Sequence, residues 1–463
     1  MSASGIEFAD AETRLARWVA GLRLPDVPQP VLAVARACIA DGLGVMLAGS
    51  ATAVFAQCAR LPRGAGDCFV ADGSSAADVR SAALLNGVAA HALDFDDTCY
   101  AGIVHGTAAV LPAVLAVAQE VDASGAMLLE AFIAGVETEY ALGLALTDSL
   151  YDRGFWSTAT LGVIGAAAGS ARLLGLDAAS TAHALRLAAN MPIGLRITHG
   201  SAGKPYLCGM AARLGTEAAY AARVGITGRP GTFERPRGYA GALNGGRLDA
   251  GALDALGTRY ALRDPGIAFK LRPMCSATQA AIEAVVALRA EHEWMPVQVE
   301  SVRCRGTALV VASLPYFEPA QPAEAQFSMS FAVACALLHG DVRLEHLNEA
   351  VLADPVLRRL MARVELHEDE ALVPPGDALA CPEAAGVEIR LSDGRRLSRT
   401  VLAATGMPQH PASTRILADK FMACATRALA PAAAREAWER LQRLESVSSV
   451  RRLLNHEAST ERT

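Results

Sequence analysis

The stretch "ALLNGVAAHALDFDDT", residues 83–98, joins a small-residue apolar run to three closely spaced carboxylates. Its apolar residues recur at three- and four-residue spacing, which predicts an α-helix with a buried face. On that helix His91, Asp94 and Thr98 would lie on one side, and Asp96 would point elsewhere. A carboxylate beside a hydroxyl on an inward face can hold a substrate carboxyl group or orient a catalytic group. The alternative is a helix C-terminus whose acids are solvated or pair with a neighbouring helix.

Helical patterns of the same kind fill the chain up to about residue 260 and return from about residue 411. Two examples are "VLAVARACIADGLGVMLAG" and "MLLEAFIAGVETEYALGLAL". The character of the chain changes after "RDPG", residues 263–266. Here "VQVESVRCRGTALVVASLP" and "RVELHED" have β-like content, and helices are expected at 278–290 and 324–338. The segment "GVEIRLSDGRRLSRTVLAA" predicts a hairpin through a Ser-Asp-Gly turn.

These patterns predict a mainly α protein with an inserted α/β domain. Both ends of the chain form an all-helical domain, residues 1–266 and 406–463. A smaller, mixed α/β lid domain occupies residues 267–405. The length of 463 residues fits two domains better than one core.

Composition excludes several classes of partner. Hydrophobic residues make up 52% of the chain but aromatic residues only 5%, a mix that suits closely packed helices. The net charge is −6 and no basic stripe is visible, which argues against nucleic acid as a partner. No run reaches the roughly 18 apolar residues of a membrane span, and the N-terminal stretch lacks signal-peptide features. We therefore expect no membrane partner and a cytoplasmic location.

The ten cysteines are scattered and never form C-x-x-C. That distribution argues against a zinc site, an iron–sulfur cluster or a disulfide framework. Cys208 and Cys275 are interpreted as small buried hydrophobes. No set of histidines and carboxylates shows metal-ligand spacing, so we expect neither a metal nor another cofactor.

Cationic residues in two segments are candidates for binding an anion. In "HGSAGKPYLCGMAARLG", Lys204 lies in a glycine-rich loop where a lysine can reach an anion while the backbone approaches closely. In "GIAFKLRPMCSATQAAIEAV", Lys270 and Arg272 would share one side of an extended segment and suit a di- or tricarboxylate. The alternatives are an exposed loop lysine and a polar strand face. Tyr316 in "LPYFEP" is either a proton donor or acceptor, or a packed ring.

A series of motifs resembles the MmgE/PrpD family over nearly the whole chain. They are "NGVAAHALDFDDT", "HGTAAVLPAVLAVA", "GFWSTATLGVIGAAAGSARLLGL", "GKPYLCGMAARLG", "FKLRPMCSATQAAIEA", "AEAQFSMSFAVACALLHGDV" and "GMPQHPASTRILADKF". The family includes 2-methylcitrate dehydratase, cis-aconitate decarboxylase and iminodisuccinate epimerase. The resemblance implies the inserted-domain architecture, a homodimer, and a cofactor-free site between the two domains.

The resemblance also implies roles for individual residues. Its motif positions fall on Asp94, Thr98, His105, Lys204, Lys270 and Tyr316. His105 would be the general acid/base, Asp94 would orient and polarise it, and Tyr316 would relay a proton. Thr98 would supply a hydrogen bond. Lys204, Lys270 and Arg272 would hold substrate carboxylates, with Lys270 also a candidate for moving a proton.

The chain departs from the family where histidine is common. Three such positions hold Trp156, Leu207 and Gln279, and Gly106 follows His105 where the family commonly has proline. Replacing imidazoles removes proton carriers that titrate near neutral pH. Either the substrate differs, or the chemistry uses fewer groups, or catalysis is poor. Arg196 and His199, just upstream of Lys204, would restore part of the lost charge, with His199 a candidate for binding substrate, or else they are loop surface.

The leading hypothesis is a cofactor-independent lyase that dehydrates a 2-methylcitrate-like hydroxy acid after α-proton abstraction. Decarboxylation of a cis-aconitate-like acid is the second hypothesis, and epimerisation of an amino-dicarboxylate such as iminodisuccinate is the third. A degenerate, carboxylate-binding paralogue without turnover is the non-enzymatic alternative. In each case the expected ligand is a small di- or tricarboxylate, and the expected assembly is a homodimer formed mainly by the helical domain.

Overall fold

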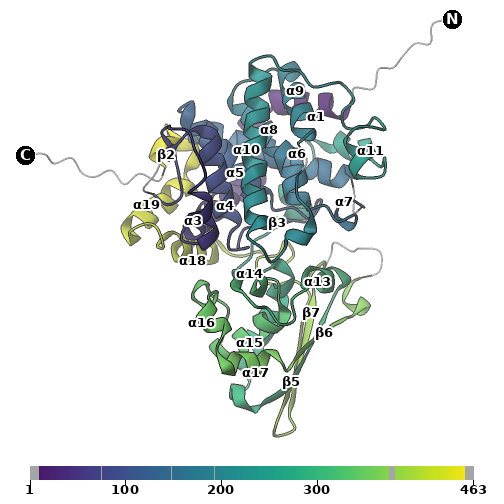
Figure 1. Cartoon of the computed structure of the whole chain (residues 1–463), viewed down its shortest axis with the longest axis vertical. Helices are drawn as coiled ribbons and strands as arrows, with labels where there is room; N and C mark the ends of the chain where they lie inside the picture. Colours follow the sequence, from purple (N-terminus) through teal and green to yellow (C-terminus); the bar gives the residue numbers. More distant parts are fainter. Residues whose placement is uncertain (1–9, 74–75, 147–148, 192, 375–380, 454–463) are drawn as a thin grey trace, which may run out of the picture.

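The computed structural model describes residues 10–453 apart from 74–75, 147–148, 192 and 375–380. The protein is mainly helical with small sheets, and Figure 1 shows two lobes. The larger lobe consists mainly of helices, and the smaller one contains the four-stranded sheet with further helices. The yellow C-terminal helices lie with the larger lobe, so both ends of the described chain belong to that lobe.

Long helices of small and aliphatic residues build the larger lobe. They are α1 (Ala11–Gly21), α2 (Gln29–Gly49), α4 (Val79–His91), α5 (Gly106–Glu120), α6 (Gly125–Leu146), α8 (Ser157–Leu173), α9 (Ala178–Ala189), α10 (Gly203–Arg223), α18 (Thr414–Ala425) and α19 (Pro431–Gln442). Short helices complete it: α3 (Ala53–Cys58), α7 (Ser149–Asp152) and α11 (Tyr239–Leu243). A Cβ on Gly87 of α4 would lie 2.7 Å from the Cα of Gly209 in α10. The backbones of these two helices therefore touch, which brings the start of α10 close to the end of α4.

Helix α2 is long and apolar enough to cross a membrane by length and composition, so the statement that no run reaches that length is wrong. However, 78% of its most apolar window is buried inside the protein. Its Asp41 lies 2.7 Å from the ammonium group of Lys420 in α18, and its Arg36 pairs with Glu445. A buried helix whose charges are paired within the chain is packed as a core helix.

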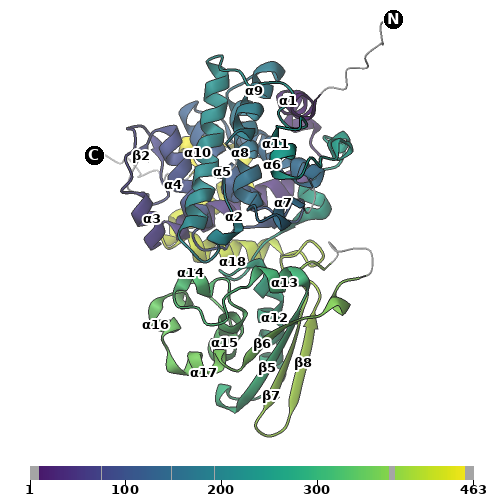
Figure 2. The same ribbon diagram turned by 45° about the vertical axis from the view of Figure 1, so that its right-hand side comes forward.

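The smaller lobe contains a mixed sheet with the strand order β6-β5-β7-β8. Strand β5 (Val299–Gly306) is parallel to β6 (Val364–Glu368) and antiparallel to β7 (Ala385–Leu391), and β7 pairs antiparallel with β8 (Arg396–Val401). The predicted hairpin is therefore confirmed. Helices α12 (Gln279–Glu291) and α15 (Met329–His339) pack against the sheet (Figure 2). The remaining helices are α13 (Ala308–Ser313), α14 (Pro322–Ala325), α16 (Glu349–Leu352) and α17 (Pro355–Met361).

One β-like prediction is wrong in part. The segment "VQVESVRCRGTALVVASLP" forms β5 only as far as Gly306, and "ALVVAS" forms α13. The Thr307 hydroxyl oxygen accepts a hydrogen bond from the Val310 amide and so begins the helix. Local capping therefore overrides the β propensity of the following valines.

The two largest hydrophobic cores divide the chain near the predicted boundaries. One core contains residues from Ala11 to Ile267 and again from Phe421 to Leu453, whereas the other is built mainly from residues between Ala268 and Met407. The two-stranded pairing of β3 (Thr98–Cys99) with β4 (Ile267–Ala268) joins the acidic stretch to the start of the second core. We retain residues 1–266, 267–405 and 406–463 as the proposed domain limits.

Candidate active site

The acidic stretch does not continue the helix as predicted. Helix α4 ends at His91, and Asp94 adopts a left-handed backbone conformation with φ of +46°. This turn reverses the chain, so Asp96 also faces His91. The prediction that Asp96 points elsewhere is therefore wrong. Thr98 lies in β3 and pairs with Ala268 of β4. This pairing brings the segment after Ala268, which carries Lys270, to the acidic stretch.

Two buried lysines contact Asp94. The Nζ of Lys204 lies 2.6 Å from Oδ1, and the Nζ of Lys270 lies 3.3 Å from Oδ2 and 2.9 Å from the Asp94 carbonyl oxygen. Burial alone would raise the pKa of Asp94, but the two ammonium groups hold it well below its ordinary value. Although burial lowers the pKa of Lys270, Asp94 and Asp96 raise it above its ordinary value. Asp94 is therefore a carboxylate shared by two ammonium groups.

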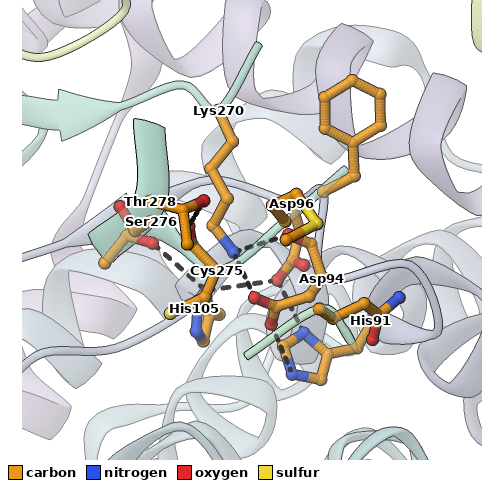
Figure 3. A network of polar contacts seen from close by, with 12 residues as sticks. His91, Asp94, Asp96, His105, Lys270, Cys275, Ser276 and Thr278 are labelled. Atoms are coloured by element: carbon orange, nitrogen blue, oxygen red, sulfur yellow. Dashed lines mark hydrogen bonds and ion pairs between the residues drawn. The ribbon is translucent and has the colours of Figure 1, made fainter. Parts of the chain in front are cut away.

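His91 and His105 share Asp96. Each Nδ1 faces Asp96 Oδ2, at 2.8 Å from His91 and 3.4 Å from His105 (Figure 3). The Nδ1 of His105 also donates to the Asp97 carbonyl oxygen at 2.9 Å. Since a carbonyl oxygen only accepts, Nδ1 carries the ring proton and Nε2 has a free lone pair. Burial and then Lys270 lower the pKa of His105 well below its ordinary value, so the ring is neutral.

His91, Asp96 and His105 also bring three possible metal-ligand atoms within 4.8 Å of one another, a set that the sequence did not reveal. The donor chemistry fits a metal poorly. The Nδ1 proton of His105 is held by the Asp97 carbonyl oxygen. Two ammonium groups stand next to the cluster, because both lysines contact Asp94 and Asp94 lies 3.7 Å from His91. We therefore interpret the cluster as a proton-handling group and derive no step through a metal.

Three further predicted residues, Thr98, Tyr316 and His199, lie in or near this cluster. The Thr98 hydroxyl lies 3.3 Å from His105 Nδ1, so Thr98 joins the cluster. Tyr316 donates its hydroxyl proton to the His199 carbonyl oxygen at 2.8 Å, which links the smaller lobe to the loop before α10. Burial, and then Lys204, lower the pKa of His199 to about 3, so its ring is neutral.

Arg272 lies apart from this cluster. Its guanidinium contacts Asp341 at 3.0 Å and Glu283 at 3.7 Å, both in the smaller lobe. The predicted shared side for Lys270 and Arg272 does not form, because β4 ends at Ala268 and the chain bends from Leu271 onward. Arg272 already has two acidic partners, and its role in binding substrate stays a prediction.

The residues that replace the expected histidines have structural roles. Trp156 is 1% exposed, and its ring centroid is 5.2 Å from that of His91 and 5.3 Å from Lys204 Nζ. Such an arrangement favours the ammonium electrostatically. The Gln279 side chain hydrogen-bonds backbone groups of residues 271, 272 and 274 and so holds the segment that carries Lys270. Leu207 packs against the helical core.

Gly106 in place of proline also has a steric reason. A Cβ at this position would lie 2.5 Å from the hydroxyl oxygen of Tyr140 in α6. Proline carries a Cβ, so it would require Tyr140 to move. The glycine lets α5 begin directly after His105, and it therefore helps to place that ring.

Sequence reasoning missed several residues of the site. Asp96 and His91 were visible in the opening motif but were not assigned a role. Cys275 is only partly buried, packs against the second core and lies beside Lys270 (Figure 3), so its interpretation as a buried hydrophobe is correct only in part. Burial, and then Asp94, raise the pKa of its thiol to about 12. Glu383 accepts a hydrogen bond from Tyr100, whose hydroxyl also lies 3.3 Å from Ser276, and no local pattern marked this contact.

A cavity of about 580 Å³ opens onto the cluster between the two lobes. Its lining includes His91, Asp94 and Lys204 from the larger lobe, and Gln326 and Phe327 from the smaller lobe. Small-molecule sites commonly have volumes of about 300–1,000 Å³. The cavity therefore offers room for a small molecule beside the Lys204 ammonium group.

The fold and the site define a two-lobed, mainly helical protein with a buried acid–base cluster facing an interlobe cavity. Residues 13–249 match the MmgE/PrpD N-terminal domain, and residues 273–446 match the MmgE/PrpD C-terminal domain. The chain belongs to the MmgE/PrpD family.

Proteins similar to this chain include cis-aconitate decarboxylases from three organisms. The human protein is 26% identical over 423 residues, which cover 88% of this chain and 86% of the relative. The mouse protein is 28% identical over 461 residues, with 94% and 91% covered. The protein from Aspergillus terreus is 26% identical over 437 residues, with 88% and 87% covered. The similarity therefore extends over both lobes.

Proposed function

We propose that this protein is a cofactor-independent lyase that decarboxylates a small tricarboxylate related to cis-aconitate. The observation that carries the proposal is the pair of buried lysines that share Asp94 at the interlobe cavity, in the same cluster as His105. The names of the similar proteins support decarboxylation over the dehydration favoured by the sequence alone.

Substrate binding uses the two ammonium groups. In the ligand-free site Lys204 and Lys270 balance the charges of Asp94 and Asp96, and both imidazoles are neutral. A substrate carboxylate in the cavity meets Lys204 first, because Lys204 is part of the cavity lining. It then competes with Asp94 for that ammonium group through a charge-assisted hydrogen bond.

Decarboxylation requires one proton at carbon. The bond between the substrate carbon and the departing carboxylate breaks, CO2 leaves, and the electron pair remains on carbon as a delocalised carbanion. His105, after taking a proton at Nε2 from solvent, donates it to that carbon. A trianionic substrate and one proton thus give CO2 and a dianionic product. Asp97 and Thr98 hold the ring through Nδ1, and Lys270 offsets charge on the remaining carboxylates.

Dehydration of a 2-methylcitrate-like hydroxy acid is the second candidate function. It is favoured by the tautomer of His105, whose Nδ1 proton leaves Nε2 able to accept an α-proton in the resting site. The α-proton would move to Nε2, and the hydroxyl group would leave as water after receiving a proton. The two reactions therefore use the same residue in opposite protonation states.

A substrate panel in deuterated water, followed by NMR, tests the proposal. The panel contains cis-aconitate, 2-methylcitrate, citrate and iminodisuccinate. We expect cis-aconitate to lose CO2 and its product to carry one deuterium. Loss of water from 2-methylcitrate would instead support dehydration, and deuterium uptake into iminodisuccinate without loss of a group would indicate epimerisation. Binding without turnover of any compound would indicate a degenerate paralogue.

A further inference from the structure

His91 has an unusual hydrogen-bonding state. Its side chain is fully buried, and Nδ1 lies 2.8 Å from Asp96 Oδ2. Among the described residues, its Nε2 has no hydrogen-bond partner. That nitrogen lies 3.7 Å from Asp94 Oδ1, the oxygen that Lys204 contacts at 2.6 Å. A buried polar atom without a partner is rare in native proteins and requires an explanation.

The groups around His91 balance in charge while both imidazoles are neutral. Those that face it from neighbouring elements are Asp94 and Asp96 after α4, His105 before α5, and Lys204 in α10. Farther out, the groups that act on these residues are Lys270, His199 and Cys208. Burial lowers the pKa of His91, although Asp96 and Asp94 oppose that shift. His91 is therefore neutral at rest, with two carboxylates ready to stabilise its cation.

A bound polycarboxylate disturbs this balance. It adds negative charge to a site that has no net surplus of positive charge, and it draws Lys204 toward the cavity. Asp94 Oδ1 then loses its 2.6 Å partner, while Lys270 still contacts Oδ2 at 3.3 Å. An uncompensated buried carboxylate oxygen is strongly unfavourable unless another donor reaches it. His91 Nε2, which has no hydrogen-bond partner among the described residues, lies 3.7 Å from this oxygen.

We propose that His91 is a positioning residue that takes up one proton at Nε2 when a substrate carboxylate draws Lys204 away from Asp94. The proton comes from solvent, and the new Nε2–H donates to Asp94 Oδ1. Closing the 3.7 Å separation to a charge-assisted hydrogen bond requires a movement of about 1 Å. This inference rests on the proposed function, because it requires that the site bind a polycarboxylate.

The proposal predicts that substrate binding is linked to proton uptake. The free site holds His91 neutral and the complex holds it protonated, so its pKa is higher in the complex. Affinity is then independent of pH below the lower of these two pKa values. Between them it falls about tenfold per pH unit as pH rises, because the required proton becomes scarcer.

Calorimetry with propane-1,2,3-tricarboxylate tests this linkage, since that compound has no hydroxyl group or double bond through which to react. Titrations of the full chain in buffers of different ionisation enthalpy give the number of protons taken up. We expect wild type to take up about one proton more than His91→Gln. The Gln amide places a permanent donor near Nε2, so this variant should bind with an affinity that depends less on pH. His91→Asn retains only the Nδ1-like donor and should bind about tenfold more weakly or worse.

Equal proton uptake in wild type and His91→Gln would overturn the proposal, and so would wild-type binding without uptake. His105→Gln is the matched control and should retain the proton uptake that depends on His91.

Nitrogen-15 NMR of histidine-labelled wild type avoids variants altogether. The Nε2 of His91 should change from unprotonated to protonated when the ligand saturates the site, and an unchanged resonance would contradict the proposal. Absence of any binding to this ligand or to cis-aconitate would instead refute the proposed function itself.

Discussion

Replacing Lys204 with methionine separates a role in substrate binding from a role in folding. The chain has only three lysines, Lys204, Lys270 and Lys420, and all three are buried against aspartates. Lys420 pairs with Asp41 at 2.7 Å and also donates to the Phe95 carbonyl oxygen at 2.8 Å. Lys204→Met and Lys420→Met therefore remove the same kind of buried ion pair from two different places.

The expected magnitudes follow from the contacts. Removing one partner of a buried ion pair costs about 3–5 kcal/mol. Lys270 still contacts Asp94, so we expect Lys204→Met to lower the free energy of unfolding by less, about 1.5–3 kcal/mol, the usual value of a hydrogen bond to a charged group. If a substrate carboxylate loses a hydrogen bond of the same strength, KM should rise by about 10- to 150-fold, with a smaller change in kcat.

The assay combines denaturant unfolding with steady-state kinetics on the substrate identified by the NMR panel. Lys420→Met should be destabilised at least as much as Lys204→Met, because Asp41 has no second lysine partner among the described residues. Its KM should nevertheless stay within a few-fold of the wild-type value. If Lys204→Met keeps the wild-type KM while losing stability, Lys204 is only a structural partner of Asp94, and the proposed binding step is wrong.

Four further results are expected. His105→Ala should lower kcat by roughly 10²–10⁴-fold with little change in KM, whereas a near-wild-type rate with an inactive His199→Ala would move the catalytic role to His199. Activity should survive exhaustive chelation, and loss with EDTA that iron or magnesium restores would show that the His91 cluster binds a metal. If the reaction begins with proton abstraction, kcat/KM should stay constant from neutral pH to below pH 6.5, because burial and Lys270 lower the pKa of His105; a decline centred at or above its ordinary value would contradict this. Light scattering should give a dimer of about 96 kDa, twice the 48.2 kDa chain, and a monodisperse monomer at micromolar concentration would exclude it.

Periodicity predicted the elements whose burial alternates regularly. The β7–β8 hairpin followed from Val387, Ile389 and Leu391 on one face, and each of them is buried. The end of α4 did not follow, because the pattern continues past His91 whereas the backbone of Asp94 turns into the left-handed region. Hydrophobic spacing contains no information about such a backbone reversal at a non-glycine residue.

The sequence pointed to several residues of the candidate site but not to the contacts between them. Motif positions pointed to Asp94, Lys204 and Lys270, and the structure places both lysines on that aspartate. The sharing of Asp96 by two histidines was hidden, because it requires the turn after α4 and the return through β3. Contacts formed by loops that reverse direction depend on tertiary packing, so spacing along the chain does not reveal them.

Trp156 shows how the site can function with fewer histidines than the family resemblance led us to expect. Its ring occupies a buried position between His91 and Lys204, where a histidine would have been a third imidazole near Asp94. Tryptophan cannot carry a proton, but its buried ring excludes water and lies 5.3 Å from the Nζ of Lys204, within the range of a cation–π contact. Lower solvent access strengthens each remaining electrostatic contact. In the proposed mechanism, proton handling is therefore concentrated in the two histidines that share Asp96: His105 would transfer the proton to carbon, and His91 would protonate beside Asp94 when substrate binds.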